Sequence, residues 1–164
     1  MALIAVTYES KARRWRGRRA FSLLEMLSVL AIVALLAAAG VTRFGSSTME
    51  NVGAEGFARK LALDLMQARR RTIATGDNHY LQLALAGSNV SGYTMYRRSA
   101  GGDVEVEQAR TTPAGVTVTA SHTTLEFDFG GGSLAGYSIS VVGPNRSWTV
   151  STVMATGAVR TTAS

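Results

Sequence analysis

The stretch "RRAFSLLEMLSVLAIVALLAAAG", Arg18–Gly40, decides how the N-terminal part of the chain folds. From residue 21 to residue 42 the sequence is apolar, apart from three hydroxyl side chains and one carboxylate, Glu25. These 22 residues would form a helix about 33 Å long, enough to cross a bilayer core of about 30 Å. An acidic side chain inside a membrane helix costs about 2.5–3.5 kcal/mol, so Glu25 indicates a functional role.

Most of the net charge of +6 lies before this stretch. Residues 1–20 hold six basic and one acidic side chain, whereas the remaining 144 residues hold 11 basic and 10 acidic ones. The high pI therefore gives little support to a nucleic-acid-binding body. The positive-inside rule places the N-terminus in the cytoplasm and the body across the membrane. The chain has no cysteine, which excludes thiolate zinc sites, iron–sulfur clusters, a cysteine nucleophile and disulfides.

Three interpretations of the N-terminal stretch compete. In the first it is a cleaved secretory signal, with "RRAF" similar to part of a twin-arginine signal and "AAAG" as a cleavage site after Ala39. In the second it is a plain membrane anchor. In the third only the basic leader is removed and the apolar helix is retained. Glu25 favours the third interpretation, because neither a signal nor a plain anchor gains anything from a carboxylate.

The residues Ala20–Met26, "AFSLLEM", resemble the recognition sequence of type IV prepilins. The resemblance implies cleavage by a prepilin peptidase between Ala20 and Phe21 and N-methylation of Phe21, with alanine standing where glycine is usual. Glu25 would then be the fifth mature residue. In a packed bundle of such helices its carboxylate would pair with an N-terminal amine, and a wrong register would leave a buried charge unpaired. We therefore expect Glu25 to set the axial register of a filament.

Helical periodicity continues to about residue 75, where Gly76 is a plausible stop. One stripe repeats at spacings of three and four residues, and three further apolar residues are expected to widen it. Glycines weaken the middle of this helix, and the arginines at 69–71 are expected to form a solvated end that complements the helix dipole. The stripe is Phe57, Leu61, Leu65, Ala68 and Thr72; the widening residues are Leu63, Met66 and Ile73; the glycines are Gly45, Gly53 and Gly56.

After Gly76 the period changes to two, which predicts a body of short antiparallel strands covered by the amphipathic half of the helix, an α+β fold. Strands are expected at 79–86, 92–97, 103–108, 115–120, 124–129, 136–142, 147–153 and 157–162. Inward faces include Leu81, Leu83 and Leu85, and Leu125, Phe127 and Phe129; Tyr93, Tyr96, Tyr137 and Trp148 are expected to pack in the sheets. The acid pairs Glu105/Glu107 and Glu126/Asp128 are expected on wet faces.

The whole chain resembles the GspH/FimT group of minor pseudopilins and pilins. The resemblance rests on "FARKLALDLMQARRRTIATGD", "LEFDFGGGS" and the terminal "TGAVR". It implies a pilin-like fold, with a long N-terminal helix packed on an antiparallel β-sheet or sandwich. The expected domains are a cleaved leader at 1–20, a transmembrane helix half at 21–43, and a periplasmic globular domain at 44–164.

Enzymatic signals are weak. "GGGSLA", 130–135, fits a dinucleotide-loop pattern, but a strand follows it where the phosphates would need a helix N-terminus, so it predicts a turn. His79 and His122 stand alone, without metal-ligand spacing or a nucleophile elbow, and are expected at turns or strand edges. We therefore predict no enzyme, no cofactor and no metal; an enzyme anchored by a pilin-like helix is the weakest hypothesis.

The resemblance favours a minor pseudopilin of a type II secretion system, assisting protein export across the outer membrane. Its partners would be other pseudopilins, the prepilin peptidase/methyltransferase and an inner-membrane assembly platform. It would cross the bacterial inner membrane once, with a cytoplasmic N-terminus and a periplasmic C-terminal domain. The alternative is a FimT/FimU-like minor pilin that binds DNA during uptake, with phosphate contacts from Arg97, Arg98, Arg110, Arg146 and Arg160.

Overall fold

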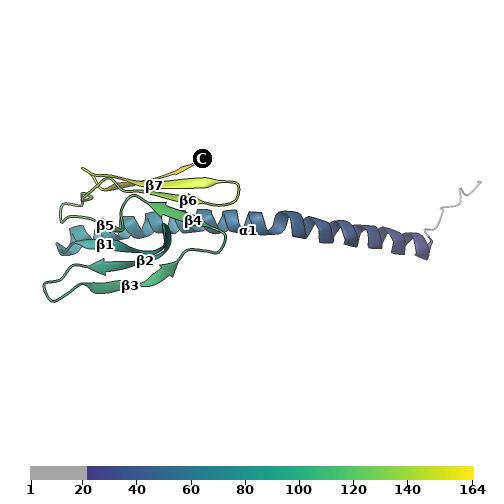
Figure 1. Ribbon diagram of the computed structural model, residues 1–164, viewed down its shortest axis with the longest axis horizontal. Coiled ribbons are helices and arrows are strands. Elements are labelled where there is room, and N and C mark those ends of the chain that lie inside the picture. Colours follow the sequence, from purple (N-terminus) through teal and green to yellow (C-terminus); the bar gives the residue numbers. More distant parts are fainter. Residues whose placement is uncertain (1–21) are drawn as a thin grey trace, which may run out of the picture. The chain divides into compact units, whose positions relative to one another are not determined.

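The computed structural model describes residues 22–164, of which the side chains of 41–44 are left aside, and divides into two compact units on either side of residue 40. Helix α1, Leu23–Thr75, begins in the first unit and ends in the second. The eight strands all belong to the second unit (Figure 1). They are β1 His79–Ala86, β2 Asn89–Arg97, β3 Val104–Thr111, β4 Thr117–Ala120, β5 Thr124–Glu126, β6 Ser138–Val142, β7 Ser147–Val153 and β8 Ala158–Ala163.

In the first unit α1 begins at a serine cap. The Ser22 hydroxyl accepts a hydrogen bond from Leu24 N at 3.3 Å, and the Ser22 carbonyl oxygen accepts bonds from Glu25 N and Met26 N at 3.0 and 3.1 Å. Ser22 thus satisfies N–H groups that a helix start would otherwise leave without partners. Apart from Glu25 and Ser28, the residues that follow are apolar on every side. This part of the helix therefore has no polar face to turn toward water.

In the second unit one face of α1 lies in the core, as the periodicity predicts. Phe57, Leu61, Leu65, Ala68 and Thr72 are all buried. The expected widening of the stripe is wrong, because Leu63, Met66 and Ile73 are 54%, 39% and 50% exposed. At about 100° per residue, Leu63 points some 200° away from Leu61, which places it on the opposite face.

The end of α1 is the predicted one. Gly76 follows the last helical residue, Thr75, with a φ of +77°, and its N–H bonds the Thr72 carbonyl oxygen at 2.9 Å. Only glycine adopts this left-handed conformation at low cost, which is why the helix stops there.

The strands form two antiparallel four-stranded sheets, ordered β3-β2-β1-β5 and β4-β6-β7-β8. Leu81, Leu125, Ile139 and Val150 from both sheets join the buried face of α1 in one hydrophobic core. The fold is therefore α+β, a helix packed on antiparallel sheets, as predicted. Tyr93, Tyr137 and Trp148 are buried, and Tyr96 is half-buried against Tyr80, with ring centroids 5.5 Å apart.

Two residues expected to face inward lie outside. Leu85 is 52% exposed because the register of β1 against β2 shifts between Ala84 and Leu85, which ends the alternation. Phe129 is 75% exposed because β5 ends at Glu126 and the chain then turns. Both errors come from extending a period-two pattern past an irregularity that only strand pairing reveals.

Candidate assembly site and polar clusters

The predicted processing residues Ala20 and Phe21 lie outside the described residues. Glu25 is described, and it lies exposed in the first turn of α1. With Ser22 as the cap, Glu25 occupies the third helical position, where an acidic side chain faces the positive end of the helix dipole. The spacing Ser-x-x-Glu is that of a capping box, so the same carboxylate suits the start of the helix.

The helix segment Leu23–Gly40 is apolar on its surface apart from Glu25 and Ser28. Its mean hydropathy is 2.3 and none of it is buried. It is long and apolar enough to cross a membrane, and Glu25 is the one charged side chain in it. Ten large apolar residues between Leu23 and Leu36 are at least half exposed. A surface of this kind requires lipid or other apolar helices around it.

A second apolar surface lies on the part of α1 that belongs to the second unit. We call it the outer stripe, and its residues are Met49, Val52, Leu63, Met66 and Ile73. Their spacings of 3, 11, 3 and 7 residues place them on one helix face, opposite the buried stripe. Each is between 39% and 74% exposed. An exposed apolar row of this length on a helix is typical of a face that contacts another protein.

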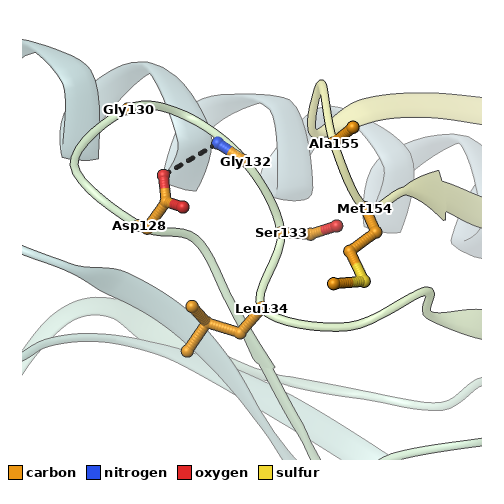
Figure 2. Close-up of a pocket in the computed structure, with 7 residues that line it drawn as sticks. All are labelled: Asp128, Gly130, Gly132, Ser133, Leu134, Met154 and Ala155. Carbon is orange, nitrogen blue, oxygen red and sulfur yellow. Dashed lines mark hydrogen bonds between the residues drawn. The ribbon is translucent and has the colours of Figure 1, made fainter.

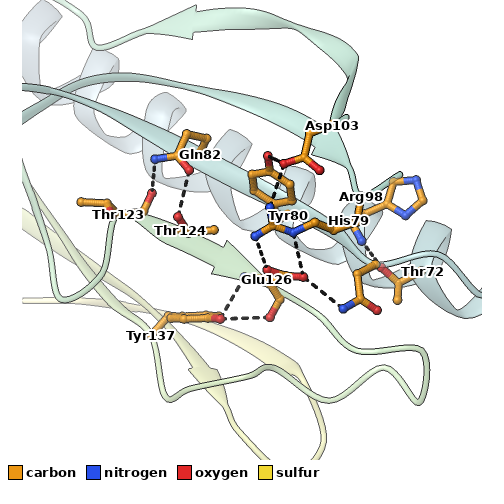
Figure 3. Close-up of polar contacts among 11 residues, drawn as sticks. Thr72, His79, Tyr80, Gln82, Arg98, Asp103, Thr123, Thr124, Glu126 and Tyr137 are labelled. Carbon is orange, nitrogen blue, oxygen red and sulfur yellow. Dashed lines mark hydrogen bonds and ion pairs between the residues drawn. The ribbon is translucent and has the colours of Figure 1, made fainter. Parts of the chain in front are cut away.

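One polar cluster joins β1, β2, β5 and the loop before β3 (Figure 3). Arg98 donates to Glu126, with Nη2–Oε2 at 2.9 Å, and also to Asp103, with Nη1–Oδ2 at 2.7 Å. Its guanidinium lies 4.3 Å from the centre of the Tyr80 ring. The Tyr80 hydroxyl donates to Asp103 Oδ2 at 2.7 Å, and Asn78 donates to Glu126 Oε1 at 3.0 Å.

The pKa values within this cluster follow from these contacts. Burial raises the pKa of Glu126, but the hydrogen bonds from Arg98 and Asn78 and the Arg98 charge outweigh it, so the pKa lies below its ordinary value. Burial and the bond to Asp103 raise the pKa of Tyr80 to about 12. The expectation of a wet acidic face is wrong for Glu126, which is only 8% exposed. Its desolvation is compensated by Arg98.

A second polar cluster ties α1 to the β2–β3 hairpin through Asp64, which the sequence reasoning missed. Asp64 is 2% exposed. Its Oδ2 accepts bonds from the Tyr93 hydroxyl at 2.9 Å and from Arg110 Nε at 3.0 Å, and Lys60 Nζ lies 2.8 Å from its Oδ1. Burial and the Asp64 carboxylate raise the pKa of Tyr93. The sequence could have indicated this buried acid, because Asp64 lies beside Leu65 on the buried side of the helix.

The expected solvated helix end at 69–71 is wrong for two of its three arginines. Arg71 Nη2 lies 2.8 Å from Glu107 Oε1 on β3, and Arg69 Nε donates to the Gly131 carbonyl oxygen at 2.8 Å. Arg70 alone is exposed, with no ion pair to any residue that the structure describes. These side chains are occupied in tertiary contacts because the helix ends beside β3 and the loop after β5.

The five arginines considered for phosphate binding fall into two groups. Arg97, Arg98 and Arg110 are each engaged by acids, Arg97 by Asp77 at 3.7 Å. Arg146 and Arg160 are exposed and make no ion pair within residues 22–164. The structure therefore does not assemble the five into one uncompensated basic patch.

The remaining candidate residues form no reaction centre among the described residues. His79 is buried at the start of β1, with Nδ1 2.8 Å from the Asp77 carbonyl oxygen; His122 is exposed, with Nδ1 2.9 Å from Ser121 Oγ. "GGGSLA" is a loop leading to β6, as predicted, and Gly132 N donates to Asp128 Oδ1 at 2.9 Å (Figure 2). Within residues 22–164, no three His, Cys, Asp or Glu side chains gather where they would hold a metal ion.

The N-terminal segment matches a known sequence family. Residues 15–41 match the prokaryotic N-terminal methylation motif. This match covers three of the six basic residues before Phe21, together with Glu25 and nearly all of the apolar segment. No curated protein matches the chain at a significant level.

Solved structures match about two thirds of the chain in fold. The minor pseudopilin EpsH from the type 2 secretion system of Vibrio cholerae aligns with a TM-score of 0.59 and 15% identity, over 67% of this chain and 96% of that one. The type IV minor pilin FimU of Pseudomonas aeruginosa PAO1 aligns with a TM-score of 0.54 and 15% identity, over 66% and 91%. Both are pilin-type proteins rather than enzymes.

The chain thus combines the prokaryotic N-terminal methylation motif with a fold like that of a minor pseudopilin and a type IV minor pilin. This likeness of fold to both EpsH and FimU is consistent with the resemblance to minor pseudopilins and pilins that the sequence indicates. An apolar N-terminal helix suited to membrane anchoring accompanies that fold.

Proposed function

We propose that this chain is a minor pseudopilin, a structural subunit of a type II secretion pseudopilus that assists protein export across the outer membrane. The observation that carries the proposal is a single carboxylate, Glu25, in the otherwise apolar segment Leu23–Gly40 of α1, which lies within the methylation motif. Cleavage between Ala20 and Phe21 would create an N-terminal amine four residues before that carboxylate. The pair would then meet inside a bundle of apolar helices, where each charge requires the other.

The proposed arrangement follows from the same features. Residues 1–20 are a leader that is removed, 21–43 cross the inner membrane once, and 44–164 form the periplasmic domain, with the N-terminus cytoplasmic. The prepilin peptidase cleaves the leader and methylates Phe21, and an inner-membrane platform adds the subunit to the filament. Other pseudopilins then cover the apolar helix and the outer stripe. The chain itself catalyses no reaction in this proposal.

Glu25 variants test the proposal. Glu25→Gln and Glu25→Leu should insert into the membrane and be cleaved like the wild type, but should enter filaments at least about tenfold less, because the register pair loses its negative member. Glu25→Asp, which keeps the charge, is the matched control and should retain most assembly. The measurements are the mass of the mature N-terminus and the amount of protein in sheared filaments. Wild-type incorporation of Glu25→Leu would refute the role of Glu25.

The alternative is a DNA-binding minor pilin. It is favoured by the likeness to FimU and by Arg146 and Arg160, which make no ion pair within residues 22–164. Against it stands the pairing of Arg97, Arg98 and Arg110 with acids, since a paired guanidinium must lose its partner to reach a phosphate. The mature chain in nanodiscs, without the basic leader at 1–20, should therefore show no salt-sensitive binding to duplex DNA at low ionic strength. Binding that Arg146→Ala and Arg160→Ala together abolish would instead establish the alternative.

A further inference from the structure

A hollow of about 490 Å³ lies where the loop after β5 meets the turn between β7 and β8. Figure 2 shows Asp128 at one end of it, Met154 at the other and Leu134 beside it, with Ser133 between them. The hollow lies within the second unit, and no residue of α1 lines it. It combines one acid, one hydroxyl and apolar walls, the composition that binding pockets for peptides and small molecules share.

The two loops that form the hollow are held in place by close backbone contacts. Gly131 and Gly157 have φ values of +80° and +60°, and a Cβ on Gly157 would lie 2.0 Å from the Gly131 carbonyl oxygen. Arg69 Nε bonds that same oxygen, and Ser133 N donates to the Met154 carbonyl oxygen at 3.1 Å. The hollow is therefore formed before any partner arrives, which lowers the entropic cost of binding.

Ser133 supplies the observation that points to a ligand. The residue is 3% exposed, and its hydroxyl has no hydrogen-bond partner in the described chain. In Figure 2 this hydroxyl points from the loop toward Met154, which also lines the hollow. A buried hydroxyl without a partner destabilises a fold, and alanine would fit the same space without that cost. The hydroxyl is therefore best accounted for by a polar group that binds in the hollow.

The Asp128 carboxylate indicates the charge of the group that would bind in the hollow. Its Oδ1 accepts the Gly132 N–H, and the carboxylate makes no ion pair with any residue from 22 to 164. A carboxylate beside apolar walls favours a cationic partner, because charge-assisted hydrogen bonds are the strongest ones available to it. Charge complementarity therefore indicates a lysine or arginine side chain.

The rim shows that the occupant is larger than a free amine. Leu134 and Met154, which line the hollow, are 52% and 61% exposed. Two large, exposed apolar side chains beside a carboxylate are typical of a protein contact, and a methionine adapts its shape to its partner. A small cation held by Asp128 would leave this apolar rim in water.

We propose that the hollow binds a segment of a partner protein in which a lysine or arginine lies next to an apolar side chain. The cation pairs with Asp128, a backbone group of the segment bonds the Ser133 hydroxyl, and the apolar side chain packs between Leu134 and Met154. Such binding requires no filament, so it goes beyond the pseudopilin role and would survive if that role were refuted.

The test follows the Met154 methyl signal by NMR in the full chain, held in nanodiscs and labelled on methionine methyl groups. The probes are acetyl-Leu-Lys-Leu-amide, the same peptide with neutral norleucine for lysine, and N-acetyl-lysinamide alone. The lysine peptide should shift the signal saturably, and norleucine should weaken binding about tenfold, which corresponds to about 1.4 kcal/mol. This comparison uses the wild-type chain, so it tests the charge even if a variant misfolds.

Two variants and one control complete the experiment. Asp128→Asn should weaken binding of the lysine peptide about tenfold, and Ser133→Ala several-fold with an equal or higher unfolding temperature. Glu105→Gln, an exposed acid on β3, should bind like the wild type. Wild-type affinity in both variants, or no Met154 shift with any probe, would overturn the proposal. Equal affinity for N-acetyl-lysinamide and the peptide would also overturn it, because the site would then take a small amine.

Discussion

Arg98 and Glu126, 28 residues apart in the sequence, form an ion pair with Nη2–Oε2 at 2.9 Å that joins the end of β2 to β5. The Glu126 side chain is 10% exposed and that of Arg98 is 47% exposed, so the acid depends on the base for its solvation. Asp103 and Tyr80 extend the same cluster. The pair crosses β1, the strand between β2 and β5 in their sheet, and so links three neighbouring strands.

Arg98→Met should destabilise the second unit by about 1–3 kcal/mol, because the buried Glu126 carboxylate would lose its charged partner. The value is below that of a fully buried pair, since water reaches Arg98. Thermal unfolding of the full chain in nanodiscs, followed by near-UV circular dichroism, measures the change. Arg70→Met, at an exposed arginine of α1, is the control and should leave the unfolding temperature unchanged within error.

Arg98→Met should also reverse the way in which the Glu126 carboxylate makes the free energy of unfolding depend on pH. In the wild type the pKa of Glu126 lies below its ordinary value of 4.5, so its contribution is present above that value and is lost as the pH falls through the folded pKa. Without Arg98, burial would raise the pKa of Glu126, and stability would fall as the pH rises through it. Unfolding temperatures measured from about pH 3 to pH 7 test the sign. Arg98→Lys should keep the wild-type sign; a wild-type profile in Arg98→Met would contradict the argument.

Two glycines should respond oppositely to alanine. In Gly92→Ala the new Cβ would lie 2.2 Å from the Arg110 carbonyl oxygen across the β2–β3 pair, which should cost about 1–3 kcal/mol. In Gly56→Ala the Cβ meets nothing within 4 Å on the exposed side of α1, and stability should rise by about 0.5–1 kcal/mol. Denaturant unfolding of both variants measures the pair, and a shift of the same sign in both would contradict it.

Alanine variants of two leucines of α1 should distinguish packing in the core from contact with other subunits. Leu65→Ala, at a side chain with no exposed area, should cost about 2–5 kcal/mol by leaving a cavity. Leu63→Ala, on the outer stripe, should change stability by less than about 0.5 kcal/mol. If the outer stripe contacts other subunits, as we propose, Leu63→Ala should still lower incorporation into filaments. Unchanged incorporation would remove Leu63 from the proposed contact.

Local patterns predicted the elements of this fold well. Phe57, Leu61 and Leu65 lie in the core because a spacing of four repeats along one face of a helix, and Gly76 ends the helix because it adopts a left-handed backbone. The strands follow from period two. Leu63 and Phe129 were misplaced because a pattern was extended beyond the face or strand to which it belongs. The processing residues Ala20 and Phe21 stay predictions, outside the described part of the chain.

By itself the sequence determined the apolar helix segment with its single acid, the change from helix to strands and the buried stripe. Each of these depends on the spacing of residues that are close together in the sequence. Only the tertiary structure decided which charges are free. Arg98 reaches Glu126 and Arg110 reaches Asp64 through pairings that join residues 28 and 46 apart. Burial then sets how strongly each acid needs its partner, since desolvation depends on the atoms packed around a charge. The hollow at Asp128 and Ser133 is equally a product of two distant loops meeting.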